Sequence, residues 1–244
     1  MRLPQTDSST AFIEYSESSE PPYPDLSLRT EHISYLSKFL NPVYLQTRTM
    51  KALMARFVEE SNIELHHFLS ASLALKLEPG LREADQTDGL NYEARQGRIP
   101  PHNAGVSGAW SPRSPPHKWR YCTLEKRAEL QRESDTILRQ LQDEFFPSEA
   151  FRAWVSAMTN LLPLSYAVEA RRFRPGLDYT LATSEGGESR LDMVLGLTPQ
   201  VEKDGIRSNG KSKANEDDEE LHGWQAGQWG GWEVGSRSYS WKYF

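Results

Sequence analysis

Hydrophobic and polar residues alternate with a period of two along the C-terminal third of the chain. The clearest case is the segment 190–197, in which every second residue is apolar: Leu191, Met193, Leu195 and Leu197. Because successive side chains of a strand point to opposite faces, this pattern predicts a half-buried strand. Residues 166–170 and 179–181 alternate in the same way, and Pro175 and Gly176 predict a turn between them. With a further, glycine-broken strand expected at 223–234, the sequence predicts an antiparallel sheet at the core.

Apolar residues recur at helical spacing in the first third of the chain. One helix is expected to end at Asn41, because the residue before a proline is pushed out of the helical region. A second helix is expected around a core-facing stripe of Met50, Leu53, Met54 and Phe57. Ser61 and Glu64 fit a capping box, which predicts that a third helix opens there and continues to Pro79 and Gly80.

A second helical region precedes the predicted sheet. A strand is expected at 117–124, followed by a long helix at 125–146 and by a further helix that Ser148 caps. Because a sheet with one apolar face must pack against another layer, the helices are expected to cover one face of the sheet. The fold class that these patterns predict is α+β, with two layers.

Three polar segments interrupt these elements. Residues 1–25 are rich in Ser, Pro and Glu and are predicted to form a disordered acidic tail ahead of one domain at 26–244. A short recognition motif around 12–15 is the alternative for part of that tail. Residues 88–116 are expected to form a long polar loop, either mobile or partner-binding. The charged stretch 199–223 is predicted to be a disordered insertion, which could also steer a basic partner.

Composition narrows the class of protein. The chain has 244 residues, 37% of them hydrophobic, and a formal net charge of -6, which suits one globular domain with flexible segments. Its 28 basic residues are scattered among 34 acidic ones, so direct nucleic-acid binding is not expected. The single cysteine, Cys122, excludes an internal disulfide and fits a reducing compartment. No apolar run approaches the roughly 18 residues of a membrane span, so the protein is expected to be soluble and without a membrane partner.

Familiar enzyme motifs are missing from the sequence. The chain lacks a GxSxG nucleophile elbow, a GxxxxGK[ST] phosphate loop and a GxGxxG segment after a strand. Cys122 lies in an expected strand and is predicted to be a buried, inert thiol. His66 and His67 are adjacent, so they diverge around a helix and do not form a chelating pair.

Several separated segments resemble one family in the right order. They are RRFRPGLDYTLAT (171–183), LDMVLGLTP (191–199) and GGWE (230–233), preceded by LSKFLNPVYLQ (36–46), FVEESNIELHHFLS (57–70) and PPHKWRYCTLE (115–125). They resemble the second, C-terminal double-stranded β-helix of eukaryotic oxygenases that use iron and 2-oxoglutarate to hydroxylate a proline of a small-subunit ribosomal protein. That half is known as the oxoglutarate/iron-dependent oxygenase C-terminal degradation domain. Nothing in the chain resembles the catalytic first domain of those enzymes.

The resemblance implies a helical layer packed on a partial, degenerate double-stranded β-helix (jelly roll), which lacks the last strands needed to close it. An iron oxygenase of this kind needs two histidines and a carboxylate on the metal. By the resemblance, the first histidine and the carboxylate would fall near Thr183 and Glu185, where the histidine is missing. Only His222 lies shortly before Arg237, which gives no anchor for 2-oxoglutarate. No catalytic and no metal-binding residue is therefore expected on this chain.

What the resemblance implies about function is a non-catalytic protein-interaction and regulatory domain. In the family this half is linked to oxygen-dependent control of a transcription factor's degradation and to translation termination, in the nucleus and the cytoplasm. No cofactor is expected on this chain, whereas the family's catalytic domain uses Fe(II), 2-oxoglutarate and ascorbate. Regulatory or translation-related protein partners are expected to bind a groove between the sheet and the long loop, lined by Trp110, Tyr166, Tyr179, Trp229 and Trp232.

Two alternatives stay open at this point. The chain could be a truncated record of an iron/2-oxoglutarate-dependent peptidyl-proline dioxygenase, or could work in trans with a separate catalytic chain. It could also be a degenerate product without function, because an unclosed sheet leaves unpaired strand edges. An HxD motif and a downstream histidine in the neighbouring coding sequence would support the first alternative. The absence of a cooperative melt would support the second.

Overall fold

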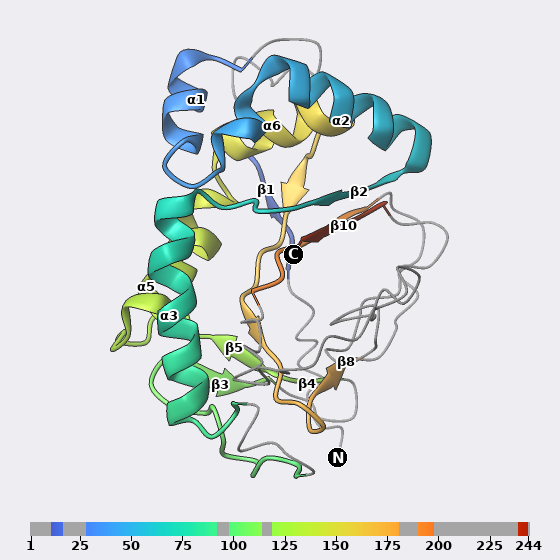
Figure 1. Ribbon diagram of the computed structural model, residues 1–244. Coiled ribbons are helices and arrows are strands. Elements are labelled where there is room, and N and C mark those ends of the chain that lie inside the picture. The colour runs from blue at the N-terminus through green and yellow to red at the C-terminus, as the bar shows by residue number, and fades with distance from the viewer. Residues whose placement is uncertain are drawn as a thin grey trace, which may run out of the picture.

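The computed structural model describes residues 11–16, 28–91, 98–113, 119–180, 190–197 and 239–243. Figure 1 shows two groups of helices beside a set of short strands. The helices gathered at one end of the molecule are α1 (Thr30–Leu36), α2 (Thr47–Glu60) and α6 (Glu149–Thr159). Two further helices, α3 (Ala71–Thr87) and α5 (Glu133–Gln140), run along one side toward the other end.

The first helix, α1, ends at Leu36, before the end predicted at Asn41. After α1 the chain enters the 3-10 turn η1 (Pro42–Leu45), and the Asn41 side chain accepts a hydrogen bond from the Val43 amide over 3.1 Å. The predicted stripe of α2 is confirmed, since Met50 and Phe57 are buried. Ile33 of α1 has an exposed side chain, whereas Leu36 and Leu40 are fully buried.

The predicted third helix begins in the wrong place. Ser61 ends α2 in the left-handed conformation, with φ of 55°, and the next residues form the strand β2 (Asn62–Leu65). Ile63 and Leu65 are each 1% exposed and alternate with exposed neighbours, so the period-two burial outweighs the capping box. Helix α3 begins after Ser70 and runs through Pro79 to Thr87, beyond the predicted end.

The predicted helix at 125–146 is correct only in its second half. Helix α5 is followed directly by the π-helical turn η2 (Leu141–Phe145), and residues 125–132 are irregular. The Arg139 guanidinium donates to the backbone carbonyls of Glu125 and Ala128, which holds this segment against α5. The next helix, α6, is confirmed together with its cap, because the Ser148 hydroxyl accepts from the Phe151 amide over 3.1 Å.

The strands in the described part of the chain form four small sheets. Three are antiparallel: β1 (Ile13–Glu14) with β6 (Ser165–Tyr166), β4 (Trp119–Arg120) with β8 (Tyr179–Thr180), and the order β3 (Trp110–Pro112), β5 (Cys122–Leu124), β7 (Arg171–Arg172). In the fourth, β10 (Tyr239–Tyr243) pairs in parallel with both β2 and β9 (Leu191–Val194). The α+β class is confirmed, whereas a single antiparallel sheet at the core is not what the described strands form.

Individual strand predictions meet different outcomes. The half-buried strand at 190–197 is confirmed by β9, whose Leu191 and Met193 pack against the core, as do Leu195 and Leu197 after it. The strand expected at 117–124 is interrupted at Tyr121, and the one expected at 166–170 is replaced by short β6 and β7. The loop predicted at 88–116 contains β3, and the tail predicted to be disordered contains β1. The insertion 199–223 and the strand expected at 223–234 lie outside the described residues.

A cluster of aromatic rings connects the helices at the α6 end. Phe68 lies 5.7 Å from Trp154 and 6.5 Å from Phe145, measured between ring centroids. Trp154 is fully buried, and its indole N–H donates to the Tyr44 carbonyl over 2.9 Å. Figure 1 shows α6 next to α1 and α2, and all three helices contact one another through α6. None of the described helices is long and apolar enough to span a bilayer.

Candidate interaction surface

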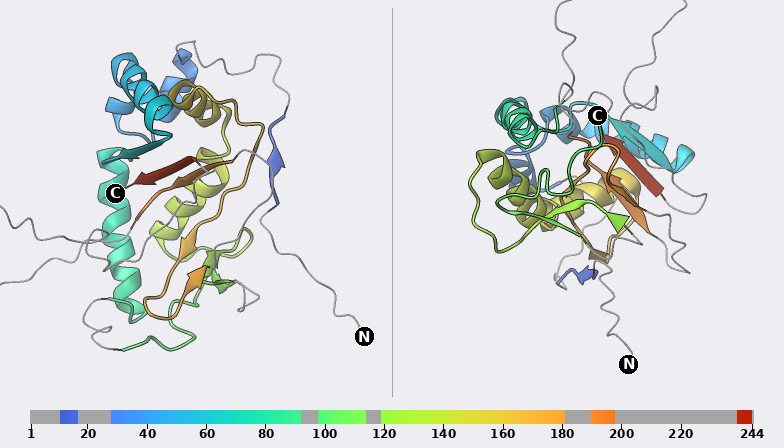
Figure 2. Two further views of the ribbon diagram at one scale, coloured as in Figure 1. Left: turned by 90° about the vertical axis from the view of Figure 1, so that its right-hand side faces the viewer. Right: turned by 90° about the horizontal axis from the view of Figure 1, so that it is seen from below.

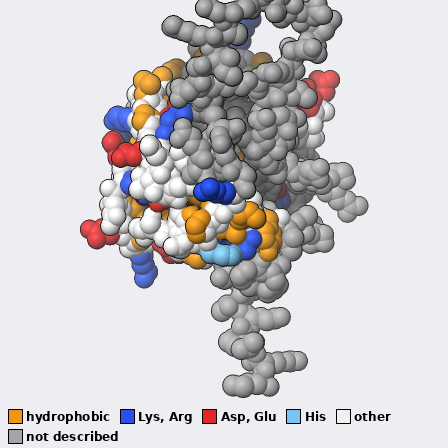
Figure 3. Space-filling view, turned by 60° about the horizontal axis from the view of Figure 1, so that its bottom comes forward, with side chains coloured by type: hydrophobic (Ala, Val, Ile, Leu, Met, Phe, Trp, Pro, Cys, Tyr) orange, Lys and Arg blue, Asp and Glu red, His pale blue; other side chains and the backbone are white. Residues whose placement is uncertain are grey.

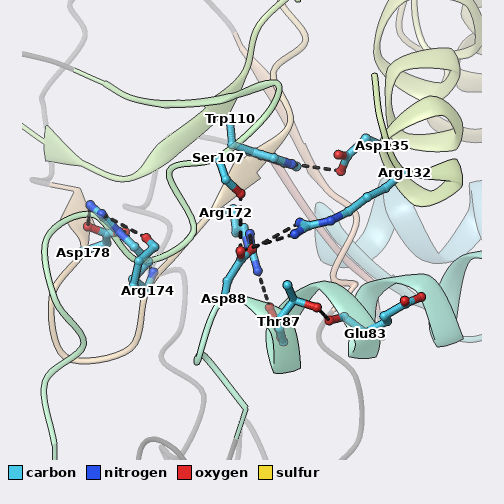
Figure 4. A network of polar contacts seen from close by, with 12 residues as sticks. Glu83, Thr87, Asp88, Ser107, Trp110, Arg132, Asp135, Arg172, Arg174 and Asp178 are labelled. Atoms are coloured by element: carbon cyan, nitrogen blue, oxygen red, sulfur yellow. Dashed lines mark hydrogen bonds and ion pairs between the residues drawn. The ribbon is translucent and has the colours of Figure 1, made fainter. Parts of the chain in front are cut away.

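A network of ion pairs joins four segments near the C-terminal end of α3. Asp88 accepts hydrogen bonds from the guanidinium groups of Arg132, over 3.2 and 3.3 Å, and of Arg172, over 2.6 Å. Arg172 also donates to Asp85 over 2.8 Å, and the Ser107 hydroxyl donates to Asp88 over 3.3 Å. Figure 4 shows these side chains converging on Asp88. The network therefore holds together α3, the loop before β3, the residue before α5, and β7.

The charges in this network are balanced and partly buried. Burial alone would raise the pKa of Asp88, but the hydrogen bonds and charges of Arg132 and Arg172 outweigh it and lower that pKa. Burial likewise opposes the charge of Arg172, but its bonds to Asp85 and Asp88 raise its pKa above the ordinary value. Asp88 and Arg172 thus both stay charged at neutral pH, and the network is suited to holding structure rather than to moving protons.

A second ion pair holds the turn between β7 and β8. The side chains of Arg174 and Asp178 are 2% and 0% exposed, and the guanidinium donates to both carboxylate oxygens over 2.7 and 2.8 Å. Arg174 also donates to the backbone carbonyls of His102 and Ala104, which ties the turn to the preceding loop. Gly176 has φ of 74°, a left-handed conformation that glycine adopts without steric cost. The turn predicted from the sequence is confirmed.

Three exposed apolar side chains lie on this turn or against it, and we call them the tip surface: Ile99, Phe173 and Tyr179. They are 69%, 42% and 38% exposed, respectively. The Cγ1 atom of Ile99 lies 3.6 Å from the position that a Cβ on Gly176 would take. Figure 3 shows hydrophobic side chains gathered with Lys, Arg and His at this end of the molecule. Exposed apolar residues on a fixed framework are typical of interaction sites.

Each aromatic ring of the tip surface is held by a neighbour. Phe173 packs against Tyr121 with ring centroids 5.3 Å apart, and Tyr121 is itself buried. The Arg120 guanidinium lies 5.3 Å from the centre of the Tyr179 ring, and its Nε donates to the Leu177 carbonyl over 2.6 Å. Both rings are therefore oriented before any partner arrives.

The structure describes three of the five residues of the predicted groove, and it does not bring these three together. Trp110 is 5% exposed in β3, and its indole N–H donates to Asp135 over 2.9 Å, so it is a core residue. Tyr166 lies in β6 and Tyr179 in β8, which belong to different two-stranded sheets. Trp229 and Trp232 lie outside the described residues. Of the three described residues, Tyr179 belongs to the tip surface.

Sequence reasoning missed Phe173 and Ile99. The segment RFRPGLD around Phe173 carried a usable signal, because an arginine and an aspartate four residues apart flank a Pro-Gly turn. For Ile99 no comparable signal exists, because it is one apolar residue in a long polar loop.

The described residues do not fit an iron site. A group of three or more His, Cys, Asp or Glu side chains that could hold a metal is absent from the part of the chain that the structure describes. Thr183, Glu185, His222 and Arg237 lie outside that part. Cys122 is confirmed as a buried thiol, and burial raises its pKa, which disfavours the reactive thiolate.

Comparison with known proteins places the chain among domains related to prolyl hydroxylases. The prolyl 3,4-dihydroxylase OGFOD1 of Ostreococcus tauri is 33% identical over 173 residues, which cover 67% of this chain and 32% of that protein. This chain thus spans about a third of the length of that relative.

A family model described as oxoglutarate and iron-dependent oxygenase degradation C-term matches residues 31–238. The chain belongs to this family, because the match covers most of its length. The family resemblance read from the sequence is confirmed.

Proposed function

We propose that this chain is a non-catalytic protein-interaction and regulatory domain of a prolyl hydroxylase-type system. The observation that carries the proposal is the tip surface, whose exposed side chains are held by the buried pair of Arg174 and Asp178. A surface that is rigid before binding loses little conformational entropy when a partner docks. Aromatic side chains next to arginines are also the residue types enriched at the energetic centres of interfaces.

The family description supports a regulatory role, since it names a degradation domain of oxygenases. The proposal includes control of oxygen-dependent degradation and a link to translation termination, with protein partners in the nucleus and the cytoplasm. A catalytic domain acting on a small-subunit ribosomal protein would hold Fe(II) and 2-oxoglutarate and use ascorbate, and no cofactor is assigned to this chain. In the same proposal, the four small sheets represent a degenerate double-stranded β-helix.

The binding test uses purified eukaryotic translation-termination factors over the immobilised chain, measured by biolayer interferometry. The double variant Phe173→Ala/Tyr179→Ala is expected to weaken capture of a termination factor by about tenfold or more, as for removal of central aromatic contacts. Leu75→Ala is the matched control, because Leu75 is an apolar side chain that is 75% exposed on α3. Equal binding by the wild type and the double variant, with the fold intact by circular dichroism, would remove the tip surface from the proposal.

A second function is favoured by the name of the relative, which is a prolyl 3,4-dihydroxylase. In this alternative the chain works in trans with a catalytic chain as part of an iron/2-oxoglutarate-dependent peptidyl-proline dioxygenase. Mixing the chain with the separately produced remainder of the Ostreococcus tauri protein should then raise the turnover of 2-oxoglutarate on a proline-containing peptide. Unchanged turnover at saturating chain concentration would exclude the alternative.

A further inference from the structure

The N-terminal segment 11–16 lies along β6, although it belongs to a stretch predicted to be a disordered tail. Ile13 pairs with Tyr166 and Glu14 with Ser165 in an antiparallel register. The Tyr15 amide extends this pairing by donating to the Leu164 carbonyl over 3.0 Å. Figure 2 shows β1 as a separate strand at the side of the molecule, away from the main body of helices.

Tyr15 is the anchor of this segment. Its ring lies 4.8 Å from the Tyr166 ring, measured between centroids, and the Arg152 guanidinium lies 4.5 Å from the centre of the Tyr15 ring. Arg152 is 8% exposed in α6, and its Nε donates to the Pro163 carbonyl over 2.8 Å. Burial raises the pKa of Tyr15 to about 12, so the phenol enters the clamp in its neutral form. The clamp is therefore built from the body of the domain.

The rest of the segment is held weakly. Only two residues pair in β1, and Phe12 and Ile13 are 53% and 45% exposed. Strand pairs of this length are not stable alone in water. A pocket of about 200 Å³ lies beside the pair, with Ala11 and Ile13 on one wall and Tyr166 and Val168 on another. Departure of the segment would open both the pocket and the edge of β6.

Charged side chains of both signs lie around the acceptor edge. The Arg190 guanidinium lies 5.6 Å from the centre of the Phe12 ring and is paired with Asp192 over 2.7 Å. Lys126 and Asp143 both line the adjoining pocket. The acceptor site thus combines a strand edge and a tyrosine clamp with no net preference for charge among these side chains.

We propose that the edge of β6, with Arg152 and Tyr166, is a peptide-binding site that residues 11–16 occupy in cis. Its ligand in trans is an extended peptide of a partner protein with an aromatic residue in the position of Tyr15. Backbone pairing to β6 supplies affinity, and the clamp supplies selection for the aromatic ring, as in other cases of strand addition. This site is independent of the tip surface and of the function proposed for it.

The cis segment lowers the apparent affinity of the site for a free peptide, because the two compete for the same edge. A tethered ligand acts at an effective concentration of about millimolar, so it competes strongly with free peptide even if its own contacts are few. The apparent affinity of the free peptide is reduced by the fraction of molecules in which the site is open. Weakening the cis segment must therefore strengthen binding in trans.

The test uses a fluorescein-labelled peptide of residues 10–18, TAFIEYSES, and the full-length chain, followed by fluorescence anisotropy. The variant Tyr15→Ala loses the cis anchor, so we expect it to bind the peptide more tightly than the wild type, by a factor of about ten or more. This factor corresponds to the loss, from the cis segment, of one desolvated cation–π contact and its ring packing. The double variant Tyr15→Ala/Tyr166→Ala should lose that gain. A peptide with alanine in place of its tyrosine should bind no variant tightly.

Three outcomes would overturn the proposal. The wild type and Tyr15→Ala could bind the peptide equally, or a cooperatively melting Tyr15→Ala chain could fail to bind it. A concentration-dependent dimer of the wild type that Tyr15→Ala abolishes would instead indicate exchange of the segment between two copies. The tip variant Phe173→Ala/Tyr179→Ala is the control for distinctness, because it should leave peptide binding unchanged.

Discussion

The helical end and the tip of this domain are held together by different forces. At the helical end, Trp154, Phe145 and Phe68 are buried against one another, and the stabilisation is apolar burial without strong directional demands. At the tip, ion pairs hold the segments together: the buried pair of Arg174 and Asp178, and the partly buried pair of Arg172 and Asp88. Replacing charges by apolar residues often stabilises a protein, so buried pairs are weak evidence for stability alone. Their use at the tip is better explained by the need for one fixed geometry around the exposed residues.

At the helical end, the substitution expected to destabilise the domain most is Trp154→Ala. The change removes a fully buried ring and the donor to the Tyr44 carbonyl, and we expect a loss of about 4 kcal/mol in the free energy of unfolding. Urea denaturation followed by circular dichroism gives the value. Leu75→Ala serves as the control, with a change expected below about 0.5 kcal/mol because the side chain is exposed. A loss no larger than that of the control would mean that this cluster does not carry the core.

At the tip, the corresponding destabilising substitution is Arg174→Met. It removes the guanidinium from the buried Asp178 carboxylate, which keeps the more distant Arg120, at 3.8 Å, and the backbone amide of residue 174, and we expect a loss of about 3 kcal/mol in the same measurement. The double variant Arg174→Met/Asp178→Leu removes both charges and should regain most of that stability. It should not regain partner binding at the tip surface, because the turn is no longer fixed. Full recovery of binding by the double variant would contradict the comparison.

Acid should act on the tip before the helical end. The pKa of Asp88 is lowered in the folded state, so its contribution is present above the ordinary carboxyl value and is lost as the pH falls through the lowered value, below about 4. Denaturation midpoints measured between pH 7 and pH 2 should therefore fall less steeply in Asp88→Asn than in the wild type. At neutral pH the same variant should be less stable by about 1 to 3 kcal/mol, the range for a buried charged hydrogen bond. If the denaturation midpoints of the two proteins fell equally with pH, Asp88 would not be the source of the acid sensitivity.

The smallest effect on stability is expected from the tip surface itself. Phe173→Ala/Tyr179→Ala removes two rings that are 42% and 38% exposed, so the free energy of unfolding should change by less than about 1 kcal/mol. A much larger loss in thermal or urea unfolding would show that the rings are part of the core. Partner binding should fall even though stability hardly changes, which separates the two roles.

Sequence patterns predicted the elements that depend on local burial. The stripe of α2, the cap of α6 at Ser148 and the half-buried β9 were all predictable, because their apolar residues repeat with the period of the element. The capping box at Ser61 misled because local capping chemistry competes with the alternating burial of Ile63 and Leu65. That burial comes from β2 packing into the core, which local sequence patterns do not include.

The candidate site was less accessible to sequence reasoning than the fold. Asp88 and Arg172 are 84 residues apart, so nothing local marks them as partners. Trp110 looked like a binding residue because it stands in a polar loop, but β3 turns it into the interior toward Asp135. Family resemblance supplied the class of domain, and the positions of the exposed rings required the tertiary structure.

Hydrogen exchange of helix α6 gives a reference against which local detachment of the N-terminal segment can be measured. Nearly all of its side chains are buried, so its amide protons should exchange with solvent deuterium only when the whole domain unfolds. The amide of Tyr15, bonded to Leu164 at the edge, should exchange each time the N-terminal segment detaches. The ratio of the two protection factors in one native sample would therefore express how much of the domain's total stability the segment needs in order to stay bound. The same ratio can be measured for the wild type and for Tyr15→Ala, and the measurement needs neither a binding partner nor an enzymatic assay.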